Sequence, residues 1–106
     1  MNINDTGVIN INGGTIIGTS GPAISNKGTI NLGDDSDAID SSNPVVQGAT
    51  NGVKTEGTFN FYDGIIKGKT AAVDGTISAY ATNSQTVTGT EVISGDTYQT
   101  LHLTDI

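Results

Sequence analysis

The sequence predicts an all-β fold: a right-handed, single-stranded parallel β-helix of about three rungs that ends in a C-terminal β-hairpin cap. Composition is the first observation behind this prediction. The 106 residues include 15 glycines and many threonines, asparagines and serines, which are poor residues for helix interiors. The second observation is an internal repeat of roughly 20 residues, which is the length of one rung in a stacked repeat fold.

The repeat is clearest between two segments that align at a constant offset of 50 residues, 7–18 and 57–68. Shorter copies begin at Gly28 and Gly75, so the spacings between successive starts are 21, 29 and 18 residues. Each copy opens with a strand whose residues alternate between the two faces. Stacking predicts two inward columns (Ile9, Ile30, Phe59, Ile77 and Ile11, Leu32, Phe61, Ala79) and two outward columns (Asn10, Asn31, Asn60, Ser78 and Val8, Thr29, Thr58, Thr76).

Two more strands complete each rung. The second ends at Gly18, Gly48 and Gly68, and the third is centred on Ile24, Val53 and Val73, five or six residues later. Glycines are expected at the corners between strands, in conformations with positive φ that other residues rarely adopt. Three short strands at constant spacing predict a triangular cross-section, whose apolar columns are buried only when rungs stack about 4.8 Å apart.

One rung carries an insertion. The distance from Leu32 to Val46 is 14 residues, whereas Ile11 and Ile16 are five residues apart. Residues 33–44 are therefore predicted to form an exposed loop, because insertions in stacked repeats map to surface loops.

The two ends of the chain have different patterns. Residues 2–6 look like the third strand of a preceding rung, with an open edge that could pair with another chain. Residues 80–106 are expected to form the hairpin cap, with Gly95 and Asp96 as its two-residue turn. The predicted organisation is a single unit over residues 1–106, with rungs over 2–79 and the inserted loop at 33–44.

The inserted loop is also the candidate metal site. Asp34, Asp35, Asp37 and Asp40 place four carboxylates within seven residues. Ca²⁺ takes about six to eight oxygen ligands, so Asp34, Asp35 and Asp37 are the residues that would bind it. Their spacing is not that of an EF-hand, and a solvated acidic loop with no cofactor is the main interpretation.

Composition excludes several classes of partner. The net charge is −7, with four Lys and no Arg, which opposes binding to nucleic acid or to an anionic membrane surface. The sequence contains no apolar run of about 18 residues, which is the length needed to cross a bilayer. The absence of cysteine excludes thiolate catalysis and disulfides.

Catalytic patterns are equally weak. Asp63 and Asp74 each precede a glycine, which is ordinary turn chemistry. A polysaccharide-cleaving site that combined them with Glu56 would need carboxylates and basic residues along many rungs, whereas this chain has about three rungs and no Arg. His102 is the only histidine and is expected to be exposed on the hairpin, with Tyr98 and Thr100 on the same face. We therefore predict that the protein is not an enzyme.

The segment 57–68 resembles the G-T-F-N-[MF]-Y-D-G-x-I-x-G repeats of adhesin-like bacterial surface proteins. The resemblance covers residues 7–79 in three or four copies. It implies a parallel β-helix in a large modular protein that is secreted or displayed on the cell surface, without catalytic residues. Implied partners are neighbouring rungs or domains of the parent protein and host or cell-wall glycans or proteins.

The main functional prediction is a structural or adhesive, non-catalytic segment of such a protein. One alternative is a carbohydrate-binding module of a surface or phage-associated β-helix protein, with Tyr62 as the stacking residue because Phe59 and Phe61 are predicted to point inward. A further alternative is ice binding by the threonine column of Thr29, Thr58 and Thr76.

Overall fold

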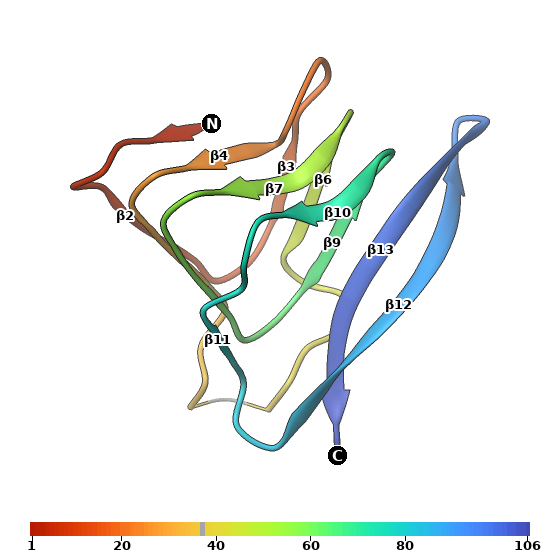
Figure 1. Ribbon diagram of the computed structural model, residues 1–106. Coiled ribbons are helices and arrows are strands. Elements are labelled where there is room, and N and C mark those ends of the chain that lie inside the picture. Colours follow the sequence, from red (N-terminus) through yellow and green to blue (C-terminus); the bar gives the residue numbers. More distant parts are fainter. Residues whose placement is uncertain (37) are drawn as a thin grey trace.

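The computed structural model describes residues 1–36 and 38–106, and these form an all-β structure of three sheets (Figure 1). Sheet A contains β1 (Asn2–Ile3), β4 (Ile24–Asn26), β7 (Asn51–Thr55) and β10 (Ala71–Asp74). Sheet B contains β2 (Val8–Ile11), β5 (Thr29–Leu32), β8 (Thr58–Phe61) and β11 (Ala79–Tyr80). Sheet C contains β3 (Thr15–Ile17), β6 (Val45–Gly48), β9 (Ile65–Gly68), β13 (Asp96–Asp105) and β12 (Ser84–Ile93). The described residues include no helix that could cross a membrane.

The chain enters the three sheets in a repeating order, first B, then C, then A. Each strand from β2 to β10 therefore pairs in parallel with strands of the preceding or following pass. The predicted register is confirmed where the repeats are regular. Ile9 lies opposite Ile30 and Ile30 opposite Phe59, and Val53 lies between Ile24 and Val73.

The core lies between the three sheets and consists of the inward columns. Ile30, Leu32, Phe59 and Phe61 are fully buried, together with Val46, Val53 and Ile66 from the other two sheets. The rings of Phe59 and Phe61 are stacked, with centroids 5.9 Å apart. Because every pass contributes only a few apolar side chains, burial depends on the neighbouring passes.

The fourth copy of the repeat departs from the predicted alignment. Tyr80 lies opposite Phe61, where Ala79 was predicted, and the partner of Asn60 is Ala79. The cause is Ser78, whose backbone N–H donates to the Phe59 carbonyl at 2.7 Å while its hydroxyl oxygen accepts the Phe59 N–H at 3.0 Å. A short polar side chain thus replaces the backbone acceptor, and regular pairing resumes one residue late. The predicted alignment of Ile77 and Ala79 as strand partners of Phe59 and Phe61 was therefore wrong.

The corner glycines are required for two different reasons, and the prediction of positive φ at all of them was wrong. Positive φ occurs at Gly14, Gly33, Gly64, Gly75 and Gly95. The glycine at the end of each second strand instead lies where two backbones approach closely. A Cβ on Gly48 would overlap the carbonyl oxygen of Asn51 and lie 2.7 Å from the backbone nitrogen of Ala23. This corner can turn tightly only because it carries no side chain.

The C-terminal strands β12 and β13 form an antiparallel hairpin that flanks the sheets (Figure 1). Its turn is at Ser94 and Gly95, with φ of 52° and 85°, one residue earlier than the predicted Gly95–Asp96 turn. Positive φ at both central residues gives the backbone twist that tight hairpins need. β13 then pairs antiparallel with β9, which places Leu101 opposite Ile66.

Apolar and ionic contacts fasten the hairpin to β9. Leu103 is fully buried, Lys67 forms a 2.7 Å ion pair with Glu91, and Lys69 forms a 3.1 Å ion pair with Asp96 that raises the pKa of Lys69. Lys67 lies opposite Thr100, Glu91 lies opposite Tyr98, and the Lys69 ammonium lies 5.7 Å from the centre of the Tyr98 ring, so these side chains cover the face that was expected to be exposed. Tyr98 and Thr100 are buried, and His102 is half-buried.

Candidate ligand-binding groove

The inserted loop contains no strand over the described residues 33–36 and 38–44, and most of these are exposed. Asp34 and Asp35 accept hydrogen bonds from different partners, and Asp37 lies outside the described residues. One Asp34 carboxylate oxygen accepts from the backbone N–H and the hydroxyl of Ser36, at 2.9 and 2.8 Å, which holds the pKa of Asp34 below its ordinary value. The Asp35 carboxylate accepts from the backbone N–H and the hydroxyl of Thr82, at 2.7 and 2.8 Å.

Calcium binding by Asp34, Asp35 and Asp37 remains a prediction that a melting experiment tests. Within the described part of the chain, no cluster of three or more His, Asp or Glu side chains is arranged to hold a metal ion. Because Asp34 and Asp35 already accept hydrogen bonds from separate groups, we expect the same melting temperature in calcium and in chelator. A melting temperature that rises with calcium and falls back with chelator would establish a metal site instead.

Asp63 fixes the base of the loop. Its carboxylate is buried and accepts hydrogen bonds from the backbone N–H of Asp34 at 3.0 Å and of Asp40 at 2.8 Å. The Asp40 carboxylate caps the next turn by accepting from Ser42, which lowers the pKa of Asp40. The sequence indicates only a turn role for Asp63, which precedes Gly64. Its partners are 23 and 29 residues away, and no local pattern indicates them.

Beside this loop, the asparagines on the outer face of sheet B form a ladder. The Asn31 side-chain amide donates to Asn10 Oδ1 at 2.8 Å, and the Asn60 amide donates to Asn31 Oδ1 at 2.8 Å. The predicted outward column of Asn10, Asn31, Asn60 and Ser78 is confirmed for its first three members, and the register shift at Ser78 ends the ladder at Asn60. Its direction leaves the Asn10 amide nitrogen outside the ladder, facing solvent as a donor.

A groove of about 290 Å³ lies between the ladder and the loop, and we call it the asparagine groove. Its lining residues are Asn10, Asn12, Asn31, Gly33, Asp34 and Tyr62. Asn12, Gly33 and Tyr62 each follow the last residue of their strand in sheet B, so they occupy equivalent corner positions. A Cβ on Gly33 would overlap the Asp63 side chain, so this corner position has room only for glycine. Its left-handed conformation, with φ of 85°, turns the chain into the loop and brings Asp34 to the rim.

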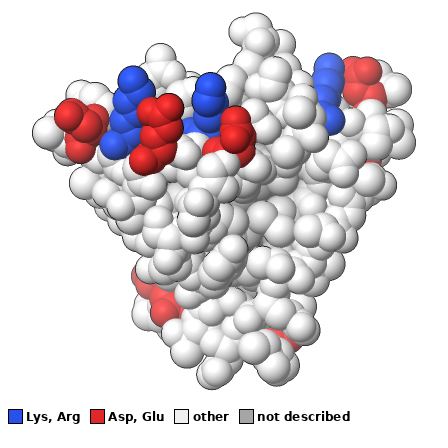
Figure 2. All heavy atoms as spheres, viewed as in Figure 1, with Lys and Arg blue, Asp and Glu red and all other residues white. Residues whose placement is uncertain are grey.

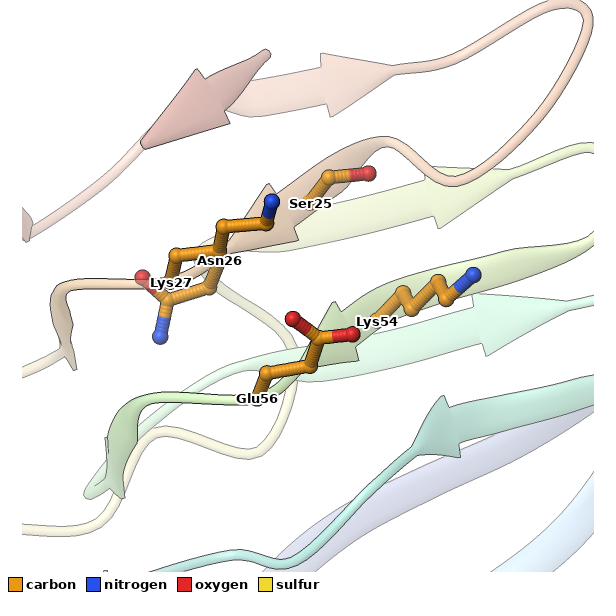
Figure 3. A pocket seen from close by; sticks show the side chains of 5 residues that line it. All are labelled: Ser25, Asn26, Lys27, Lys54 and Glu56. Carbon is orange, nitrogen blue, oxygen red and sulfur yellow. The ribbon is translucent and has the colours of Figure 1, made fainter. Parts of the chain in front are cut away.

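A second hollow, of about 270 Å³, lies over sheet A (Figure 3). Lys27, Lys54 and Glu56 line it, and Figure 3 shows the Lys54 ammonium pointing away from Glu56. Figure 2 shows that the basic side chains of the viewed face lie along its upper rim beside several acidic ones, that further acidic side chains lie near its lower end, and that its middle is uncharged. Because this hollow contains both positively charged lysines and a negatively charged carboxylate, it favours neither an anionic nor a cationic ligand. We therefore place the candidate site at the asparagine groove.

Of the three carboxylates considered for catalysis, Asp63 lies apart from the other two. Asp63 is committed to the loop backbone, Glu56 lines the hollow over sheet A, and Asp74 lies opposite Lys54 in the pairing of β7 with β10. Asp63 thus stands at a different corner from Glu56.

Comparison with protein-family models, curated proteins and solved structures finds no match.

Proposed function

We propose that the chain is a non-catalytic structural or adhesive segment of a larger secreted or cell-surface bacterial protein, built as a right-handed parallel β-helix of about three rungs. The observation that carries the proposal is the parallel register, in which equivalent residues of successive repeats pair in all three sheets. A fold of this kind extends by adding rungs, so it suits a stalk. The hairpin β12–β13 serves as the cap of sheet C.

The sheet edges support a role within a longer assembly. β1, β2 and β3 are edge strands at the same end of sheets A, B and C. An edge strand offers unpaired backbone N–H and C=O groups, which a further rung can pair with. The partners in this proposal are neighbouring rungs or domains of the parent protein, with host or cell-wall glycans or proteins on the outer surface.

A second candidate function is carbohydrate binding, and the asparagine groove favours it. Tyr62 alone would be a thin basis for this function, but the fold places it beside Asn12, Asn31 and Asp34. Ice binding has less support, because Thr29 and Thr58 pair within the sheet whereas Thr76 lies outside the strands. A thermal-hysteresis measurement distinguishes ice binding from the adhesive and carbohydrate-binding functions.

An attachment assay tests the main proposal. Beads coated with the chain should adhere to surfaces that carry bacterial cell-wall material or host glycoproteins, and beads coated with heat-unfolded chain should not. The same polysaccharides are incubated with the soluble chain, and reducing ends are counted. Attachment without new reducing ends is the expected result. Release of reducing ends would replace the proposal with an enzymatic function.

A further inference from the structure

We propose that the asparagine groove binds one residue of a neutral saccharide, through a pair of adjacent hydroxyl groups and one apolar ring face. This inference rests on the second candidate function, carbohydrate binding, and names its site and ligand class. Sugars present hydroxyls that both donate and accept hydrogen bonds, next to a ring face made of C–H groups. A site for them therefore needs donors, acceptors and an aromatic surface close together.

The groove supplies donors and an acceptor on opposite walls. The ladder wall has the Asn10 amide nitrogen, which lies outside the ladder, and the exposed Asn12 amide. The loop wall has Asp34. One of its oxygens accepts from Ser36, and the second accepts no hydrogen bond from the part of the chain that the structure describes, so it can accept from a ligand. Two neighbouring hydroxyls can accept from the amides and donate to the carboxylate, which is a charge-assisted hydrogen bond.

Tyr62 supplies the aromatic surface. Its half-buried side chain packs against the core, so its ring is held in place as part of the groove. Phe59 and Phe61 are fully buried and cannot contact a ligand. Tyr62 is thus the aromatic residue that lines this groove.

Charge and size define the ligand further. The groove is lined by a carboxylate and by no lysine, in a chain of net charge −7, so an anionic sugar would be repelled. A volume of about 290 Å³ is at the lower end of the range for small-molecule sites, which corresponds to one sugar residue and not to a long chain segment.

The walls are held before a ligand arrives. Asp63 fixes the backbone of Asp34, and hydrogen bonds from Asn31 and Asn60 order the ladder. Binding then costs less conformational entropy than it would on a mobile loop. The site is shallow and partly exposed, so we expect weak affinity for a single residue that increases when several copies are displayed together.

A glycan array followed by titration calorimetry tests the inference. Neutral glycans should be retained in preference to sialylated or uronic-acid glycans. Asp34→Asn keeps the hydrogen bonds from Ser36 but removes the charge, and Asn12→Ala removes an exposed donor. Each should weaken binding by about tenfold, the equivalent of about 1.4 kcal/mol. Tyr62→Ala should weaken it at least as much.

Controls keep the result interpretable. Tyr80→Ala removes an exposed tyrosine that does not line the groove and should leave affinity unchanged. Tyr62 contacts the core, so the Asp34 and Asn12 variants, whose side chains are exposed, decide the case if Tyr62→Ala fails to fold. Unchanged affinity in both, a preference for anionic glycans, or an array without retained glycans would overturn the inference. Bead attachment to a protein surface would still support the adhesive proposal in that event.

Discussion

Replacement of Phe59 by alanine is expected to lower the free energy of unfolding by about 3–5 kcal/mol. Phe59 is fully buried, lies opposite Ile30 of the preceding pass and stacks on Phe61. Its removal therefore leaves a cavity in the middle of the stack, where neither neighbouring pass can move closer without breaking strand pairing. Urea denaturation followed by far-UV circular dichroism measures the effect.

Thr58→Ala is the matched control, because Thr58 is the preceding residue of the same strand and is exposed on the outer face. Surface changes of this kind alter stability by about 0.5 kcal/mol or less. Domains of this size are stable by roughly 5–15 kcal/mol, so a loss of about 3–5 kcal/mol should move the urea midpoint of the Phe59 variant well below that of Thr58→Ala. Equal midpoints for the two variants would mean that Phe59 is not part of the inner column.

The column through Ile30 and Phe59 was predictable because two independent regularities agree on it. Alternation within each strand assigns the inward face, and constant spacing between strands assigns the partner in the next pass. Both regularities are properties of the sequence. The same reasoning predicted the pairing of Ile24 with Val53 and the neighbouring positions of Asn10 and Asn31 in one outward column, where their side chains form a hydrogen bond.

The predicted strand pairing of the fourth copy was wrong because one side chain changes the register of the repeat. The hydroxyl of Ser78 accepts the Phe59 N–H, and nothing in a Gly-Thr-Ile-Ser pattern shows that the hydroxyl will compete with a backbone carbonyl. The corner glycines show a similar limit. Sequence identifies Gly48 as a corner residue, but only the three-dimensional approach of Asn51 shows why it must be glycine.

The candidate groove combines residues that the sequence presents separately. Asp34 was singled out as a metal ligand and Tyr62 as a stacking residue, without any reason to place them together. Their proximity depends on Gly33 and on the buried Asp63, which draws the start of the loop against the next pass. Contacts across 29 residues are set by folding of the whole stack, so no local pattern encodes them.

Asn26→Ala is the second change with a large expected effect, a loss of about 3 kcal/mol of stability. The Asn26 side chain is buried at the corner between β4 and β5. Its oxygen accepts the Gly28 N–H at 3.0 Å, and its nitrogen donates to the Thr58 carbonyl at 2.9 Å and the Thr55 hydroxyl at 3.1 Å. Alanine would leave these groups buried without partners, which costs more than the loss of an ordinary surface hydrogen bond.

Two further variants separate this bonding role from simple loss of volume. Asn31→Ala removes an amide of similar size from the partly exposed ladder, where water can replace its partners, and should cost about 1 kcal/mol. Asn26→Asp keeps the shape but turns a donor into a second acceptor, facing the Thr58 carbonyl. Its carboxylate is disfavoured in that place, so its pKa should rise and the variant should gain stability relative to wild type as the pH falls. If Asn26→Asp is as stable as wild type at neutral pH, then the amide nitrogen contributes nothing and the corner is held by strand pairing alone.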